Sequence, residues 1–127
     1  MQEMRMNLND QVVNLELSKR LAEMGIKKMS LFYWHNDGKE YYPSYGDPQY
    51  CLCGANYSAF TVIELLEILP IGEDDFYGIY ITKGDSKYFV SYNNNIGENE
   101  EFTDYNLANA LASMLITLIE SGIIKND

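Results

Sequence analysis

The sequence predicts an α+β fold in which an antiparallel sheet of two hairpins packs against helices, in the order α-ββ-α-ββ-α. Apolar residues recur at helical spacing in three segments, and runs rich in β-branched and aromatic residues lie between those segments. The dipeptides Asp37-Gly38 and Gly84-Asp85 stand between paired runs of this kind, as hairpin turns do. Short hairpins cannot cover their own apolar faces, so we expect the helices to lie over the sheet.

The chain of 127 residues has the length of one domain, which can bury a core without metal or disulfide bonds. Its apolar fraction of 46% and charged fraction of 22% are typical of a globular protein. We therefore expect a single domain over residues 1–127, with residues 1–8 flexible.

The first helix is predicted to begin after Asp10 or Asn14, either of which can cap it, and to run to about Met24. Gly25 suits the left-handed position that follows a helix. One apolar stripe runs along this helix and comprises Val13, Leu17, Leu21 and Met24.

The first hairpin is predicted from the β-rich runs Lys28–His35 and Glu40–Tyr45, joined at Asp37-Gly38 by a type I′ turn. This turn pairs His35 with Glu40 near an exposed tip, and it pairs Trp34 with Tyr41. Side chains alternate across a sheet. One face, expected in the core, holds Phe32, Trp34, Tyr41 and Pro43; the other holds Leu31, Tyr33, His35, Glu40 and Tyr42.

The next segment, PSYGDPQYCLCGANYS, reads as irregular connection because it is rich in Pro, Gly, Asp and Asn. Thr61 and Glu64 then form a capping box for a short helix that stops before Pro70. A second hairpin is predicted from Phe76–Lys83 and Lys87–Tyr92, with Gly84-Asp85 in a II′ turn, and NNNIGENEEF reads as a loop.

The last helix is predicted from a cap at Thr103 or Asp104 to Glu120–Ser121, closed by Gly122. It holds no charged residue between Tyr105 and Ile119, whereas surface helices normally carry charges opposite the core stripe. Two explanations are open. A second copy of the chain could pack on the small residues, Ala108 and Ala112 among them, or the sheet and first helix could bury both flanks. We predict the homodimer.

The charge balance, 9 basic against 19 acidic residues, gives a net charge of −10. The negative electrostatic potential of such a chain repels nucleic-acid phosphates and anionic lipid, so we expect neither nucleic acid nor membrane as a partner. No apolar run approaches the roughly 20 residues that span a bilayer. The first ten residues lack the apolar centre of a signal peptide. We therefore expect a cytoplasmic protein with Cys51 and Cys53 as free thiols.

No motif in the sequence supports a catalytic, cofactor-binding or metal-binding assignment, and we expect no cofactor. We predict a non-enzymatic, acidic protein-protein interaction module with an unidentified protein partner. Tyrosine is enriched at interfaces. The predicted interaction surface comprises Tyr33, His35, Glu40, Tyr42, Tyr45, Tyr50, Tyr57, Ala108 and Ala112. The alternative is a small enzyme or metal-binding protein centred on His35, Cys51 and Cys53, although structural zinc usually shows a second Cys or His pair.

Four stretches, NLELSKRLAEMGI, FYW, YSAFTVIELLEILP and ANALASMLITLIESGII, resemble a family of small uncharacterised proteins of phages and prophages of gut bacteria. The similarity spans most of the chain but consists of helix caps and core residues, and the sequence departs from the family pattern at Phe60, where Pro is usual. The resemblance implies a shared fold and a phage or prophage accessory protein in the bacterial cytoplasm. The resemblance carries over no functional residue. A further alternative for the function is a minor structural component of the virion.

Overall fold

The computed structural model describes residues 7–26, 30–36, 38–45, 57–69, 76–94 and 100–122. Helices and strands alternate along these segments. In chain order the elements are η1 (Leu8–Asp10), α1 (Leu15–Glu23), β1 (Phe32–Asn36), β2 (Tyr41–Tyr45), β3 (Tyr57–Ser58), α2 (Val62–Ile68), β4 (Phe76–Lys83), β5 (Tyr88–Asn94), β6 (Glu101–Asp104) and α3 (Leu107–Glu120).

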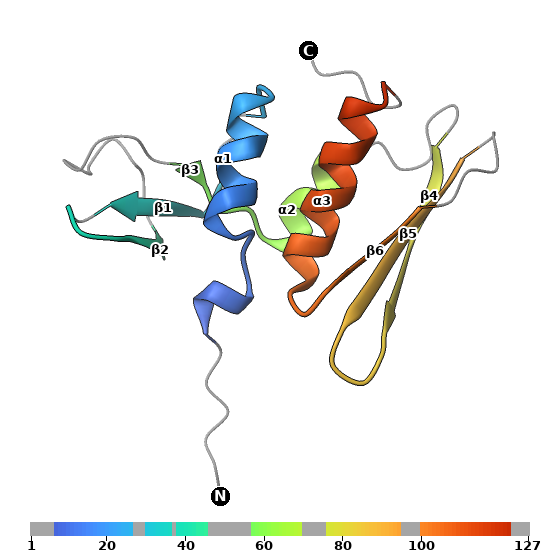
Figure 1. Ribbon diagram of the computed structural model, residues 1–127, viewed down its shortest axis with the longest axis horizontal. Coiled ribbons are helices and arrows are strands. Elements are labelled where there is room, and N and C mark those ends of the chain that lie inside the picture. Colours follow the sequence, from blue (N-terminus) through green and yellow to red (C-terminus); the bar gives the residue numbers. More distant parts are fainter. Residues whose placement is uncertain are drawn as a thin grey trace, which may run out of the picture.

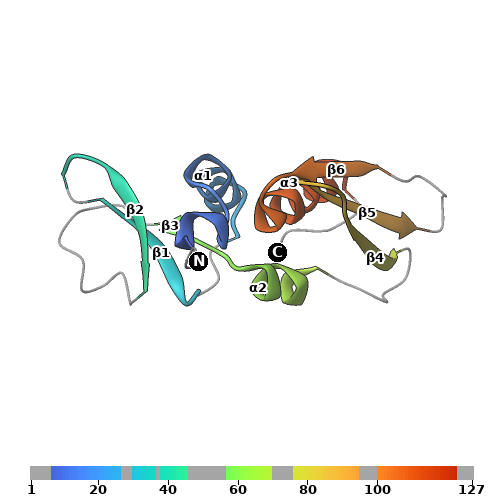
Figure 2. The ribbon, with the colours of Figure 1, turned by 90° about the horizontal axis from the view of Figure 1, so that it is seen from below.

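The described residues confirm the α+β class and correct the number of sheets. Two three-stranded antiparallel sheets are present, with strand orders β2-β1-β3 and β4-β5-β6, so the element order is α-βββ-α-βββ-α. We call them the first and the second sheet. The helices lie between them, with α1 nearer the first sheet and α3 against the second (Figure 1). Seen from below, α2 lies to one side of α1 and α3 (Figure 2).

The two strands that the sequence did not predict are β3, which pairs with the non-consecutive strand β1, and β6, which pairs with the preceding strand β5. Tyr57 and Ser58, expected in a loop, pair with β1 as its second neighbour. Glu101–Asp104 pairs with β5, which keeps Thr103 and Asp104 extended. The last helix therefore begins later than predicted, and its N-cap is Asn106.

Both hairpins close with longer connections than the turn dipeptides predicted. In the first hairpin His35 faces Tyr42 and Trp34 faces Pro43, so the pairing of His35 with Glu40 is wrong. The register is shifted by two residues. A one-residue shift moves every side chain to the other face, whereas a two-residue shift leaves the faces unchanged. The predicted division of side chains between the two faces is therefore kept.

The second hairpin turns around Asp85 and Ser86, because Gly84 donates its N–H to the Lys87 carbonyl at 2.8 Å. Gly84 has no positive φ, so the II′ turn is wrong. A Cβ on Gly84 would lie 2.8 Å from the Phe89 ring, so a larger residue here would force that ring to move.

The predicted helix ends are confirmed where they depend on local caps. Asn14 caps α1 by accepting from the Leu17 N–H at 2.8 Å, and Gly25 follows with φ 91°. Thr61 and Glu64 form the capping box of α2. Of residues 1–8, expected to be flexible, residues 1–6 lie outside the described part of the chain, and Leu8 belongs to η1.

The main core surrounds α3, which packs against α1, α2, β5 and β6. This internal coverage explains why α3 carries no charged residue before Glu120, because its small and apolar side chains pack against other elements of the same chain on several sides. The fully or almost fully buried residues of α3 are Ala108, Ala110, Leu111, Ala112, Met114, Leu115 and Leu118. A second cluster holds the first sheet, where Trp34 packs with Val12 and Ala59 and donates from Nε1 to the Val13 carbonyl at 2.9 Å.

Residues 9–14 join the three helix starts. The Asn106 amide nitrogen donates to the Val12 carbonyl at 2.9 Å, and Asn109 Oδ1 accepts from the Asn14 N–H at 2.8 Å. Val13 donates its N–H to the Phe60 carbonyl, next to the cap of α2. The N-termini of all three helices are therefore tied to one short segment, which shapes the pocket described below.

Candidate functional site

The hairpin residues predicted as an interaction surface divide between buried and exposed positions. Tyr33 and His35 are buried, whereas Tyr42 and Tyr45 are exposed on opposite faces of β2. The Tyr33 hydroxyl accepts from the Ser30 N–H at 3.1 Å, as expected of a packed tyrosine. Both faces of β1 are covered, because Tyr33 and His35 on one face and Trp34 on the other are all buried. These residues do not form one accessible surface.

His35 stacks on Tyr42, with ring centroids 5.9 Å apart. The side chain is only 9% exposed, and its Nε2 atom is buried without a hydrogen-bond partner among the described residues. Catalysis by a histidine requires an aligned donor, acceptor or substrate. The packing around this ring provides none of these at Nε2.

The remaining tyrosine of the predicted surface within the described residues, Tyr57, packs beside α1. The Lys19 ammonium lies 5.1 Å from the Tyr41 ring centroid and 5.8 Å from that of Tyr57. Glu40 is exposed and precedes β2, and Tyr50 lies outside the described residues. Tyr41 and Tyr57 therefore contribute to holding α1 on the first sheet.

Ala108 and Ala112, proposed from the sequence as contacts for a second copy, have no exposed surface. They face the chain's own sheet and helices, so they offer nothing to a partner. The alternative explanation, internal burial of both flanks, accounts for the uncharged helix. The predicted homodimer loses its supporting argument.

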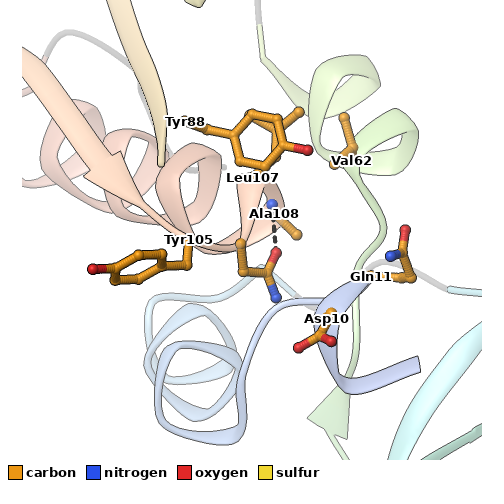
Figure 3. Close-up of a pocket in the computed structure, with 8 residues that line it drawn as sticks. Asp10, Gln11, Val62, Tyr88, Tyr105, Leu107 and Ala108 are labelled. Atoms are coloured by element: carbon orange, nitrogen blue, oxygen red, sulfur yellow. Dashed lines mark hydrogen bonds between the residues drawn. The ribbon is translucent and has the colours of Figure 1, made fainter. Parts of the chain in front are cut away.

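A pocket of about 410 Å³ lies where the start of α3 meets η1, α2 and β5 (Figure 3). Its tyrosines are Tyr88 from β5 and Tyr105 from the turn before α3. In Figure 3 the Tyr88 hydroxyl points toward Val62, and the Tyr105 ring points away from the other side chains. The full lining is Asp10, Gln11, Val62, Tyr88, Tyr105, Asn106, Leu107 and Ala108.

The helix starts beside this pocket have few free N–H donors. Asn106 Oδ1 accepts from the Ala108 N–H at 2.8 Å, and the side chains of Asn14 and Thr61 cap α1 and α2 in the same way. Anion sites at helix starts depend on such donors being free. The pocket is therefore poorly suited to a phosphate or carboxylate, and Asp10 adds a negative charge to its wall.

The tyrosines of the pocket also anchor the lysines of the hairpin tip. The Lys83 ammonium lies 5.5 Å from the Tyr88 ring centroid, and the Lys87 ammonium lies 5.2 Å from that of Tyr105. Because Lys83 pairs with Tyr88 in the β4–β5 ladder, the pocket adjoins the tip of the second sheet.

The second sheet and the turn before α3 expose large apolar side chains near this pocket: Tyr105 lines it, Ile81 shares the face of Tyr88, and Tyr80 lies on the opposite face of β4. Tyr80, Ile81 and Tyr105 are 59%, 42% and 68% exposed. The β4–β5 hairpin projects past the first turn of α3, which leaves this end of the sheet without a helix (Figure 1). We call Tyr80, Ile81, Tyr105 and the pocket the open end of the second sheet. The sequence carries no signal for it, because alternation in Ile79–Lys83 is typical of any half-buried strand.

The metal-binding alternative is without support in the described part of the chain, where no three His, Cys, Asp or Glu side chains gather as a metal site would require. Cys51 and Cys53 lie outside those residues. No described helix is long and apolar enough to cross a bilayer. Comparisons of the chain with protein-family models, with curated proteins and with solved structures give no match.

Proposed function

We propose that the protein is a non-catalytic interaction module that binds another protein at the open end of the second sheet. The observation that carries the proposal is the exposure of Tyr105 in the pocket, of Ile81 on the face of β4 that Tyr88 shares, and of Tyr80 on the opposite face of that strand. Exposed apolar side chains gathered beside a cavity are characteristic of protein contact sites, where a few aromatic residues provide most of the binding energy.

The charge of the chain favours a cationic partner. A net charge of −10 attracts basic surfaces over long range and speeds their association. The sequence resemblance to small phage and prophage proteins suggests where such a partner would be found, namely among the cytoplasmic proteins of a bacterial host. No group in the pocket is arranged for acid–base or metal chemistry, so binding is the function its residues support best.

Site-specific photocrosslinking tests the proposal in cells of the organism that encodes the chain. A photoreactive phenylalanine analogue replaces Tyr105 in one variant and Tyr45 in the control, since Tyr45 is 72% exposed on the first sheet. We expect one protein with a basic surface to be crosslinked from position 105 and not from position 45. Identical products from both positions, or an adduct of two copies of this chain, would contradict the proposal.

A further inference from the structure

The strand β4 has one free edge. It lies at the end of the order β4-β5-β6, and no described strand pairs with its other side. Backbone groups alternate between the two edges of an antiparallel strand. Because the bond from Gly84 to Lys87 closes the hairpin, the alternation turns the N–H and C=O groups of Ile79, Ile81 and Lys83 away from β5.

Most of this edge is accessible, although Ile79 at its start is half-buried. Tyr80 through Lys83 are exposed, and a Cβ added to Gly78 would meet nothing within 4 Å. The pairing with β5 shifts between Phe76 and Gly78, so the regular part of the edge begins at Ile79. Five residues from Ile79 to Lys83 span about 17 Å, the length of a typical strand.

We propose that this edge binds an extended, lysine- or arginine-containing segment of the partner protein, which joins the second sheet as a fourth strand. The inference rests on the binding function proposed above and specifies how the partner is held. Main-chain hydrogen bonds to Ile79, Ile81 and Lys83 provide affinity in this mode, and alternate side chains of the segment contact the strand's two faces. On one face they cover Tyr80, and on the other they cover Ile81 beside the pocket.

Charge decides between a partner segment and a second copy of this chain. Two copies would each bring a net charge of −10, so pairing β4 with β4 works against their mutual repulsion. The stretch Ile79–Lys83 carries a single charge, that of Lys83 at the tip. A cationic segment is attracted by the net charge of the chain, and the two lysines it would approach, Lys83 and Lys87, lie only at the hairpin tip.

A short acetylated peptide of alternating lysine and valine is the probe. We expect it to shift the amide signals of Ile79, Ile81 and Lys83 in nuclear magnetic resonance spectra of the labelled protein, and to slow exchange of those amide hydrogens. The same peptide methylated on alternate backbone nitrogens loses hydrogen bonds along one edge. We therefore expect its affinity to be lower by a factor of about ten or more. A glutamate–valine peptide should not bind. Equal binding of the methylated peptide, or shifts elsewhere, would overturn the proposal.

A pair of variants separates strand addition from the broader binding function. Ile81→Pro removes an outward N–H, which is the edge position where proline leaves the existing ladder intact. Ile81→Val keeps that N–H. If the crosslink from position 105 is lost with Ile81→Pro and kept with Ile81→Val, strand addition is supported. If the crosslink survives Ile81→Pro, strand addition is wrong although the partner still binds. If the chain without a substitution at Ile81 gives no crosslink, the binding function itself is refuted. The methylated peptide tests the proposal on the unaltered protein should Ile81→Pro not fold.

Discussion

Asn106 holds the N-terminal segment against α3, and its removal should destabilise the fold measurably. Its amide nitrogen donates to the carbonyls of Val12 and Asn9, and its oxygen accepts from the Ala108 N–H. Loss of a helix cap costs about 1 kcal/mol. An unpaired buried carbonyl at Val12 costs about 1–3 kcal/mol. We therefore expect Asn106→Ala to lower the free energy of unfolding by about 2–4 kcal/mol.

Urea unfolding followed by circular dichroism measures this change. The variant Asn106→Ser separates the contribution of the helix cap from that of the bonds to Val12 and Asn9. Serine is a good N-cap, so this variant retains the cap of α3 and loses only the bonds to Val12 and Asn9. We expect the serine variant to lose the larger part of the stability that the alanine variant loses. If Asn106→Ser is as stable as the unaltered protein, the bonds to residues 9–12 contribute nothing and the reasoning is refuted.

Three further substitutions test the core. Trp34 is 7% exposed, so Trp34→Ala should lower the free energy of unfolding in urea by about 3–5 kcal/mol, and a loss below about 1 kcal/mol would be incompatible with its burial. His35→Phe puts carbon in place of the buried Nε2 atom, which has no hydrogen-bond partner among the described residues, so it should raise the midpoint of thermal unfolding. A lower midpoint would show that Nε2 does have a hydrogen-bond partner. Ala112→Glu places a charge at a fully buried position and should abolish folding, as seen by circular dichroism; a folded variant would mean that this face of α3 is not covered.

The sequence predicts those parts of the fold that depend on neighbouring residues. Asn14, Thr61 and Gly25 define helix ends through side-chain caps and a left-handed backbone position, and each is confirmed. The faces of the first hairpin follow from alternation and survive the change in register. Pairings between strands that no predicted turn joins are not encoded in this way. β3 and β6 are short and rich in polar or turn-forming residues, and only their partners β1 and β5 make them strands.

The candidate site was not predictable from the sequence for a related reason. Its pocket combines η1, α2, β5 and the start of α3, segments brought together by hydrogen bonds such as that from Asn14 to Asn109. The buried His35 was misjudged because the shift in register places it opposite Tyr42, whose ring stacks on it, and not opposite Glu40. The tyrosines of the first hairpin looked like an interface by composition, whereas Tyr105, the exposed tyrosine of the pocket, lies elsewhere in the sequence.

The free edge of β4 is protected only at its two ends. Natural sheets guard their edges with charges, prolines and bulges. Here the register shift at Gly78 and the charge of Lys83 bracket the strand, and the uncharged stretch between them, Ile79–Thr82, carries none of these devices. Such an edge would ordinarily pair with a second copy. The net charge of −10 opposes that association and attracts a basic partner, so one property favours both an edge without a second copy and the partner that we expect to fill it.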